Sequence, residues 1–225
     1  MAAAATRKSD RVQWLLVAIG SVCLVLGGAA TLLASNLAPG LVKRMLTAER
    51  PVEIRLIKPG RALMDFQLTE RSGRTVTAAD IAGHWTVVHL LYTSCSAGCA
   101  LLGQRMAEVQ KLVAADPEVR LLSITVDPRT DTPAVLTKYA DRLGADKDKW
   151  LFVTGPKADI YQLVETSIEP AREQKGPIIP DSFPDTDRLF IVDPQGLVRA
   201  SIDGMHRGVA KALVGEMERL KKEAR

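Results

Sequence analysis

Apolar and polar residues are distributed along the chain in segments whose period predicts strands and helices in turn. Short runs of Val, Ile, Leu and Phe are too short for helices and rich in β-favouring residues. Between them lie longer segments in which apolar residues recur every three or four positions, as on one face of a helix. The predicted core strands are 86–92, 119–126, 150–153, 188–192 and 198–202, and the predicted helices are 98–115, 133–143, 156–165 and 208–222.

Local signals support these boundaries. Thr132 and Pro133 predict a helix start, because threonine caps helices and proline suits the first turn. The segment 193–196, Asp-Pro-Gln-Gly, predicts the turn of a hairpin between the last two strands. Strands that alternate with helices, then a closing hairpin and a final helix, predict an α/β domain with a thioredoxin-like layout, in which helices flank a mixed sheet.

Individual core positions follow from the helical period. We expect inward-facing residues in the helix over 98–115 and in the last helix, namely Leu101, Met106, Val109, Leu112, Leu213, Val214 and Met217.

An uncharged apolar segment lies near the N-terminus. Residues 14–34 carry no Asp, Glu, Lys or Arg, and about 20 such residues span a bilayer as a helix. A cleaved signal peptide is the alternative, but its apolar core is only about 7–15 residues long. Basic residues in the segment 1–13 precede the span, so we expect a cytoplasmic tail, a single transmembrane anchor and the rest of the chain outside.

The remaining chain divides into a tether and a folded domain. Proline and glycine recur between residues 35 and 61 and interrupt any long helix, which predicts a tether. The thioredoxin-like domain is predicted over 62–225. In a bacterium it would hang from the inner (cytoplasmic) membrane into the periplasm, and in an organelle it would face the intermembrane space.

Charge and cysteine content narrow the function. The net charge of +4 is mild and no basic cluster alternates with aromatic residues, so nucleic-acid binding is not expected. The chain has three cysteines, too few for a disulfide-stapled scaffold. Cys23 lies in the apolar segment and is expected to pack as a small apolar residue. Cys95 and Cys99 therefore remain as one pair available for chemistry.

The pair Cys95 and Cys99 follows the strand over 86–92 and begins the next helix. In such a sheet the functional site lies at the carboxyl ends of the strands, and a helix N-terminus favours the thiolate form. The spacing Cys-x-x-x-Cys, with Gly98 between, permits a disulfide and equally permits two thiolates to hold one soft ion such as Cu(I). The alternative is a passive disulfide or two buried thiols.

The chain has three histidines, and none stands out as a metal ligand. We expect His84 to be a solvated surface residue and His89, within a strand covered on both faces, to be a hydrogen-bonded core residue. His206, near the start of the last helix, is also expected to be structural. A cysteine pair without a placed imidazole suits Cu(I) or dithiol redox chemistry better than Cu(II).

Several motifs together resemble the Sco/SenC family over roughly residues 62–220. The cysteine motif is similar to that of the family, and a single N-terminal anchor fits the same pattern. The motifs are Tyr92-Thr-Ser-Cys-Ser-Ala-Gly-Cys99, Ile124-Thr-Val-Asp-Pro-Arg-Thr-Asp-Thr-Pro133, Trp150-Leu-Phe-Val-Thr-Gly155 and Leu189-Phe-Ile-Val-Asp-Pro-Gln-Gly196.

This resemblance implies a membrane-tethered protein that helps assemble the copper centre of cytochrome c oxidase, by delivering copper, by reducing cysteines of the oxidase, or by both. In the family the two cysteines bind copper together with a histidine, whose position here is occupied by Asp185. A carboxylate is a harder ligand than imidazole. We therefore expect Cys95 and Cys99 to retain Cu(I) handling and the protein to lack a stable Cu(II) complex.

Three interpretations remain open. In the first, Cys95 and Cys99 act as a redox dithiol, with Cys95 as the attacking thiol and copper binding weakened. In the second, a metallochaperone holds copper with both cysteines and with Asp185 or His206. In the third, a non-catalytic docking subunit has a locked disulfide. The expected partners are a cytochrome c oxidase subunit, or another respiratory membrane complex, and the lipid bilayer.

Overall fold

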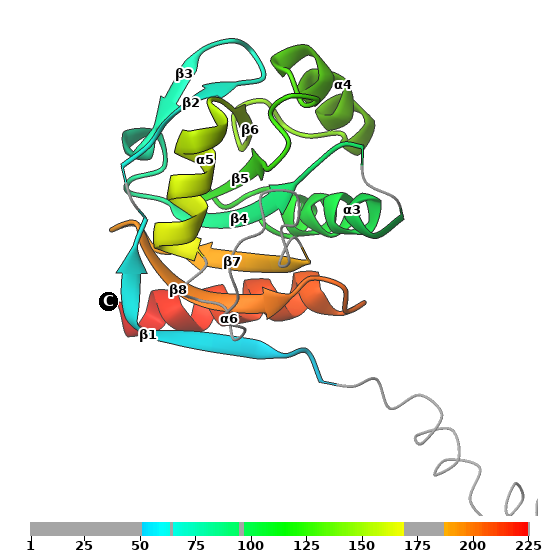
Figure 1. Cartoon of the computed structure of the whole chain (residues 1–225). Coiled ribbons are helices and arrows are strands. Elements are labelled where there is room, and N and C mark those ends of the chain that lie inside the picture. The colour runs from blue at the N-terminus through cyan, green and yellow to red at the C-terminus, as the bar shows by residue number, and fades with distance from the viewer. Residues whose placement is uncertain (1–50, 64, 95–96, 169–186, 225) are drawn as a thin grey trace, which may run out of the picture. The chain divides into compact units, whose positions relative to one another are not determined.

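An eight-stranded mixed sheet forms the centre of the structure (Figure 1). The structure is a computed structural model that describes residues 51–63, 65–94, 97–168 and 187–224. The sheet order is β1-β8-β7-β4-β5-β6-β2-β3. The strands are β1 (Ile54–Ala62), β2 (Gln67–Glu70), β3 (Thr75–Thr77), β4 (Trp85–Leu91), β5 (Val119–Thr125), β6 (Trp150–Thr154), β7 (Arg188–Val192) and β8 (Leu197–Asp203).

The three central strands β4, β5 and β6 are parallel, and the remaining pairs are antiparallel. All seven residues of β4 are buried, as expected for a strand covered on both faces. The helices are α3 (Ala97–Leu112), α4 (Pro133–Leu143), α5 (Lys157–Leu163) and α6 (Val209–Glu223), with a 3₁₀ turn at Ala78–Asp80 and a π-helical turn at Val164–Ile168. This order confirms the predicted alternation of strands and helices and the closing hairpin.

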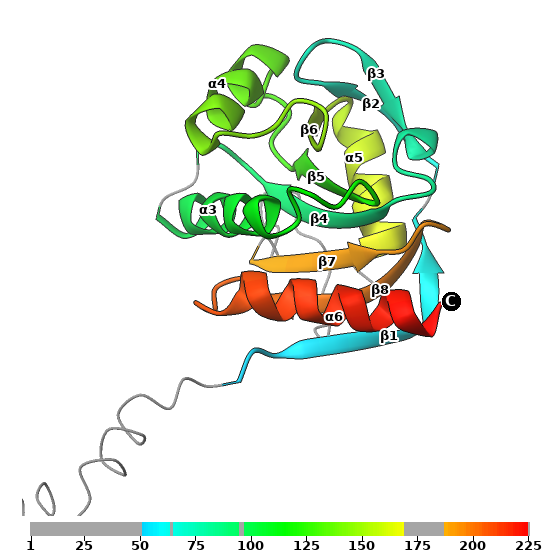
Figure 2. The same ribbon diagram turned by 180° about the vertical axis from the view of Figure 1, so that it is seen from behind.

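Helices cover both faces of the sheet. Residues of α3, α4 and α6 pack with Val87 and Leu91 in one apolar cluster, whereas α5 packs with Val88 and Leu90 in a second. Figure 2 shows α3, α4 and α6 in front of the sheet and α5 behind it. Because side chains of a strand alternate between faces, β4 contributes to both clusters.

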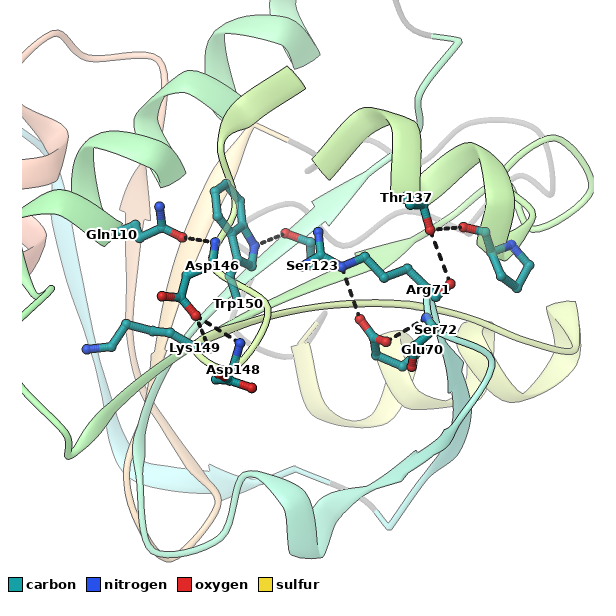
Figure 3. Close-up of polar contacts among 11 residues, drawn as sticks. Glu70, Arg71, Ser72, Gln110, Ser123, Thr137, Asp146, Asp148, Lys149 and Trp150 are labelled. Carbon is teal, nitrogen blue, oxygen red and sulfur yellow. Dashed lines mark hydrogen bonds and ion pairs between the residues drawn. The ribbon is translucent and has the colours of Figure 1, made fainter. Parts of the chain in front are cut away.

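The helix α4 has the start and end that the sequence predicts. The hydroxyl of Thr132 accepts a hydrogen bond from Val135 N at 3.4 Å, and Pro133 occupies the first turn. Gly144 ends the helix in the left-handed region at φ +64°, where glycine is favoured. The hydroxyl of Thr137 lies 2.9 Å from Pro133 O and 3.2 Å from Arg71 O, which ties α4 to the turn after β2 (Figure 3).

The sheet includes a strand that the sequence analysis assigned to the tether. Ile54 pairs with Ile202 and Leu56 with Ala200, so β1 forms the edge next to β8. Pro59 and Gly60 fall within β1, where the register shifts between Leu56 and Arg61, and do not end the strand. The predicted domain start near residue 62 is therefore too late, because the strand accommodates both residues through an irregularity at the edge of the sheet.

The predicted tail 1–13, anchor 14–34 and most of the tether lie outside the described residues. Within the described part of the chain, no helix has the length and apolarity needed to cross a bilayer.

The buried stripe of α3 differs from the predicted one. Met106 and Val109 are buried as expected, but their neighbours on the stripe are Leu102 and Val113. Leu101 is half-buried and Leu112 is 49% exposed. Residues 102, 106, 109 and 113 follow the helical period more closely than 101 and 112 do. The buried face of α3 is therefore shifted by about one residue from the predicted face. In α6, Leu213 and Met217 are buried as predicted, while Val214 is half-buried.

Gly204, just after β8, lies where α3 meets the start of β7. A Cβ atom there would collide with Leu102 Cδ2 and come within 2.7 Å of Asp187 O. We expect Gly204→Ala to destabilise the folded unit Val52–Arg225 by about 1–3 kcal/mol, because the backbone carbonyl cannot move aside cheaply. Denaturant unfolding of the two proteins measures this difference.

Gly215 in α6 provides the matched control, because a Cβ atom there meets nothing within 4 Å. Gly215→Ala is expected to stabilise the protein by up to about 1 kcal/mol. Equal stabilities of the two alanine variants would contradict the close approach at Gly204.

Candidate functional site

The two sequence-predicted cysteines belong to the connection from β4 to α3. The strand ends at Leu91 and the helix begins at Ala97, so Cys99 falls in the first turn of α3. Cys95 and the side chain of Cys99 lie outside what the structure describes. The backbone nevertheless places the connection at the carboxyl end of a central parallel strand, where α/β sheets commonly bind ligands.

The entrance to β7 and the exit from β8 lie at the same edge of the sheet. Leu189 pairs with His89 in an antiparallel register, so residues that precede Leu189 continue towards the carboxyl end of β4. Gly204 N donates to Asp187 O at 2.8 Å, which joins the end of β8 to the start of β7. Asp185, the predicted substitute ligand, is outside the described residues. The described chain resumes at Asp187 and enters the sheet at this edge.

A buried carboxylate fixes the chain just before Cys95. Asp131 is 0% exposed, and its oxygens accept hydrogen bonds from Thr93 N at 3.1 and 3.2 Å, from the Thr93 hydroxyl, and from the Thr125 hydroxyl at 2.6 Å. Thr125 Oγ1 in turn accepts from Asp127 N at 3.0 Å. Asp131 therefore connects the end of β4, the end of β5 and the loop before α4.

Asp131 lies within the motif 124–133, and its role was not predicted from the sequence. The available signal was a carboxylate placed directly before the helix-capping Thr132, at the carboxyl end of a central strand. One of its partners, Thr93, lies 38 positions earlier in the chain. No local sequence pattern therefore reveals this contact.

A cleft with a volume of about 290 Å³ opens beside Thr93, between α3 and α4. Its lining residues are Tyr92, Thr93, Ala100, Gln104, Tyr139, Arg142 and Leu143. The Tyr139 hydroxyl lies against the backbone of Gly103, one helical turn after Cys99. Burial raises the pKa of Tyr139, so the phenol is neutral at physiological pH. The cleft therefore opens beside Thr93, just before the thiol connection.

His89 is a core residue, as predicted. Its Nδ1 lies 3.3 Å from Ser123 Oγ, which also accepts a hydrogen bond from Trp150 Nε1 at 2.9 Å. Nε2 is buried and has no hydrogen-bond partner among the described residues. Burial lowers the pKa of His89 to about 3, so the ring is neutral.

The other two histidines make local contacts. His84 Nδ1 lies 3.0 Å from Ala82 O, in the turn before β4. This histidine is half-buried, less solvated than expected. His206 Nδ1 accepts a hydrogen bond from Gly208 N at 3.0 Å, just before α6. A neutral histidine that accepts at Nδ1 carries its proton on Nε2, so this contact disfavours His206 as a metal ligand.

Among residues 51–63, 65–94, 97–168 and 187–224, no group of three or more His, Cys, Asp or Glu side chains forms a candidate metal site. Cys95 and Asp185 lie outside these residues, so the copper site stays a prediction.

A sequence profile of the SCO1/SenC family matches residues 56–221. The chain belongs to the SCO1/SenC family. A SCO1 protein homolog of Bacillus subtilis (strain 168) is 27% identical over 142 residues, which cover 62% of this chain and 72% of the relative. The mitochondrial SCO2 homolog of Bos taurus is 28% identical over 141 residues, covering 59% of this chain but only 50% of that relative.

Solved Sco structures share the fold. BsSco, described as a Sco-family cytochrome c oxidase assembly protein with a disulfide switch, matches with a TM-score of 0.62 and 22% identity over 73% of this chain and 96% of its own. Yeast Sco1 with copper bound matches with a TM-score of 0.57 and 18% identity over 74% of this chain and 95% of its own. The predicted α/β thioredoxin-like fold, with helices on both faces of a mixed sheet, is therefore confirmed.

The buried His89 predicts a pH-dependent stability. Between pH 6.5 and about 3 the unfolded chain binds a proton at this residue and the folded chain does not. The contribution of neutral His89 to the free energy of unfolding is therefore complete above pH 6.5. It decreases as the pH falls through this window, by up to about 1.4 kcal/mol per pH unit. Removing the imidazole in His89→Leu should abolish this contribution.

We expect the free energy of unfolding of the wild type to fall, relative to that of His89→Leu, by about 2 kcal/mol between pH 7 and pH 5. Urea unfolding at each pH measures it. His84→Gln is the control and should keep the wild-type profile. If the free energies of unfolding of the wild type and His89→Leu changed in parallel with pH, the pKa of His89 would be the same in the folded and the unfolded chain. This result would contradict the prediction.

Proposed function

We propose that this SCO1/SenC protein is tethered to a membrane and acts in the assembly of the copper centre of a respiratory oxidase, through thiol chemistry at Cys95 and Cys99. The observation that carries the proposal is the placement of the Cys-x-x-x-Cys segment, in a chain of this family, between the carboxyl end of β4 and the first turn of α3. The description of BsSco as a cytochrome c oxidase assembly protein with a disulfide switch supports it.

In the proposed reaction the Cys95 thiolate attacks a disulfide of the partner protein. A mixed disulfide forms, and one partner thiolate leaves. The Cys99 thiolate then attacks the Cys95 sulfur and releases the second partner thiolate. The partner gains two electrons and the protons from the two cysteines, and Cys95 and Cys99 end as a disulfide. The N-terminus of α3 favours this chemistry, because its partial positive charge stabilises a thiolate at Cys99.

Copper is the second substrate of the proposed site. Two thiolates are soft ligands that prefer Cu(I), and copper-bound yeast Sco1 supports copper as the metal of this fold. Because Asp185 occupies the position that the family resemblance gives to histidine, we propose that the third ligand is weak and that Cu(II) is not retained. His206 is less suited as a substitute because its Nδ1 accepts from Gly208 N.

The uncharged segment 14–34 is the proposed anchor. With the basic residues before it on the cytoplasmic side, the SCO1/SenC domain faces outward, into the periplasm of a bacterium. A relative from Bacillus anthracis that is described as a lipoprotein supports membrane attachment as a feature of the family. The proposed partner is a cysteine-containing subunit of the oxidase or of another respiratory membrane complex.

We expect the full chain in detergent, with Cys23→Ser to leave one cysteine pair, to take up Cu(I) and to lose at least tenfold in affinity on Cys95→Ser. The reason is that one thiolate replaces two as soft ligands. Competition with a coloured Cu(I) chelator measures the affinity. A dithiol potential near about −270 mV, the value typical of reducing oxidoreductases, would support the reductase step.

Two results would contradict this proposal. A cysteine pair that reductants do not open would leave a docking subunit with a locked disulfide. A reduced pair that neither binds Cu(I) nor transfers electrons to glutathione disulfide would exclude both thiol functions.

The weak third ligand gives a separate expectation. Asp185→His should create Cu(II) binding, seen as new thiolate-to-copper absorption, because it restores an imidazole to the position that supplies one in the family. Asp187→His, two residues closer to β7, is the matched control and should not create this absorption. An identical response of both variants would indicate adventitious binding in this segment.

A further inference from the structure

The side chain of Arg71 is buried beneath α4, and the backbone of the same residue fixes its course. Arg71 N donates a hydrogen bond to Phe152 O at 2.9 Å, and Arg71 O lies 3.2 Å from the Thr137 hydroxyl. From this fixed point the side chain runs inward, and its guanidinium carbon lies 5.1 Å from the centre of the Phe152 ring (Figure 3). The residue is 8% exposed. A guanidinium therefore lies inside the domain, where an unpaired donor is costly.

Among the described residues, only Nε of this guanidinium has a partner. Nε lies 3.4 Å from Glu70 Oε1, while Glu70 Oε2 accepts a hydrogen bond from Ser72 N at 2.7 Å. Nη1 and Nη2 are buried and have no hydrogen-bond partner in the described part of the chain. Buried donors are ordinarily paired with a protein group, an ordered water or a bound ion. The edge formed by Nη1 and Nη2 thus has a binding capacity that the described chain does not use.

Arg71 also lines a pocket with a volume of about 380 Å³, between the β2–β3 turn, α4 and the loop before β6. Two further cations, Arg74 and Lys147, line the same pocket. Both of these side chains are exposed, so Arg71 is the most deeply buried cation of the pocket. A buried guanidinium with exposed cations above it is an arrangement that attracts an anion.

The remaining charges around the pocket select the class of anion. Asp141 and Asp148 are exposed carboxylates that also line it, whereas the carboxylate of Glu70 already faces Nε of Arg71. Carboxylates at the rim repel an anion in proportion to its charge, which disfavours dianionic phosphate relative to a singly charged anion. The two terminal nitrogens of a guanidinium match the two oxygens of a carboxylate in a bidentate contact.

We propose that this pocket binds a small monocarboxylate, whose two oxygens accept hydrogen bonds from Nη1 and Nη2 of Arg71. Lys147 at the rim adds attraction, and Asp141 and Asp148 discriminate against anions of higher charge. Both nitrogens are closed to solvent in this structure, so the ligand displaces part of the rim as it enters. The site is independent of the thiol function, because none of its lining residues belongs to the connection from β4 to α3.

The test uses the full chain in a nonionic detergent, with acetate as the probe at constant ionic strength. Saturation-transfer NMR of the acetate methyl group measures binding, for which we expect a millimolar dissociation constant because so small a ligand makes few contacts. Inorganic phosphate should compete with acetate only at concentrations at least tenfold higher. Arg71→Met keeps an unbranched stem over Phe152, removes the guanidinium and should abolish acetate binding. Arg105→Met, which removes a largely buried guanidinium of α3 outside the pocket, should retain the parent affinity.

Substitutions at the rim remain informative if Arg71→Met does not fold, because these side chains are exposed. Lys147→Gln should weaken acetate binding by about two- to fivefold, and Asp148→Asn should strengthen it by a similar factor, as expected for charges near the surface. Asp148→Asn should also reduce the preference for acetate over phosphate. Lys138→Gln, an exposed change on α4 outside the pocket, should leave the affinity at the parent value.

Three results would overturn the proposal. A folded parent protein that does not bind acetate would mean that water alone pairs with Arg71. A folded Arg71→Met protein that binds acetate as the parent does, or equal affinities of Lys147→Gln and Asp148→Asn, would place the bound acetate outside this pocket. Phosphate that binds more tightly than acetate would contradict the selection of a monocarboxylate.

Discussion

The pairing of β4 with β5 on one side and β7 on the other is the constraint on which the arrangement depends. All seven β4 side chains are buried, so neither face of the strand is open to solvent. A strand held in this way cannot slip by one residue without turning its apolar side chains to the wrong cluster. Its carboxyl end is consequently a fixed point from which the thiol connection and α3 extend.

Much of the fold follows from local sequence signals. Thr132, Pro133 and Gly144 define α4 through short-range chemistry, and the 193–196 turn defines the hairpin β7–β8. The strand β1 was missed because its place in the sheet depends on pairing with β8, more than a hundred positions away. Ile54 and Leu56 alternate with charged residues, which favours a strand. The tether was predicted because Pro59 and Gly60 follow them, and both residues are unfavourable within strands.

Buried polar residues were the least predictable part of the chain. Arg71 directly follows β2 and is only 8% exposed; its Nε lies 3.4 Å from Glu70 Oε1, and its guanidinium carbon lies 5.1 Å from the centre of the Phe152 ring. Figure 3 shows it running beneath α4 from the end of β2. Asp131 was missed for the same physical reason. A charge becomes buried only where partners from distant segments converge, and this convergence is a property of the tertiary structure.

The edge of the sheet that carries the thiol connection also receives the start of β7 and the end of β8. The chain before Arg188 therefore joins the sheet at the edge where β4 leads into the thiol connection. The sequence has Asp185 before β7, where the family resemblance implies a histidine, while another carboxylate, Asp131, is buried and accepts from Thr93 N just before the thiol connection. Because a carboxylate is a harder donor than imidazole, the proposed copper affinity of this chain rests on the two thiolates of Cys95 and Cys99.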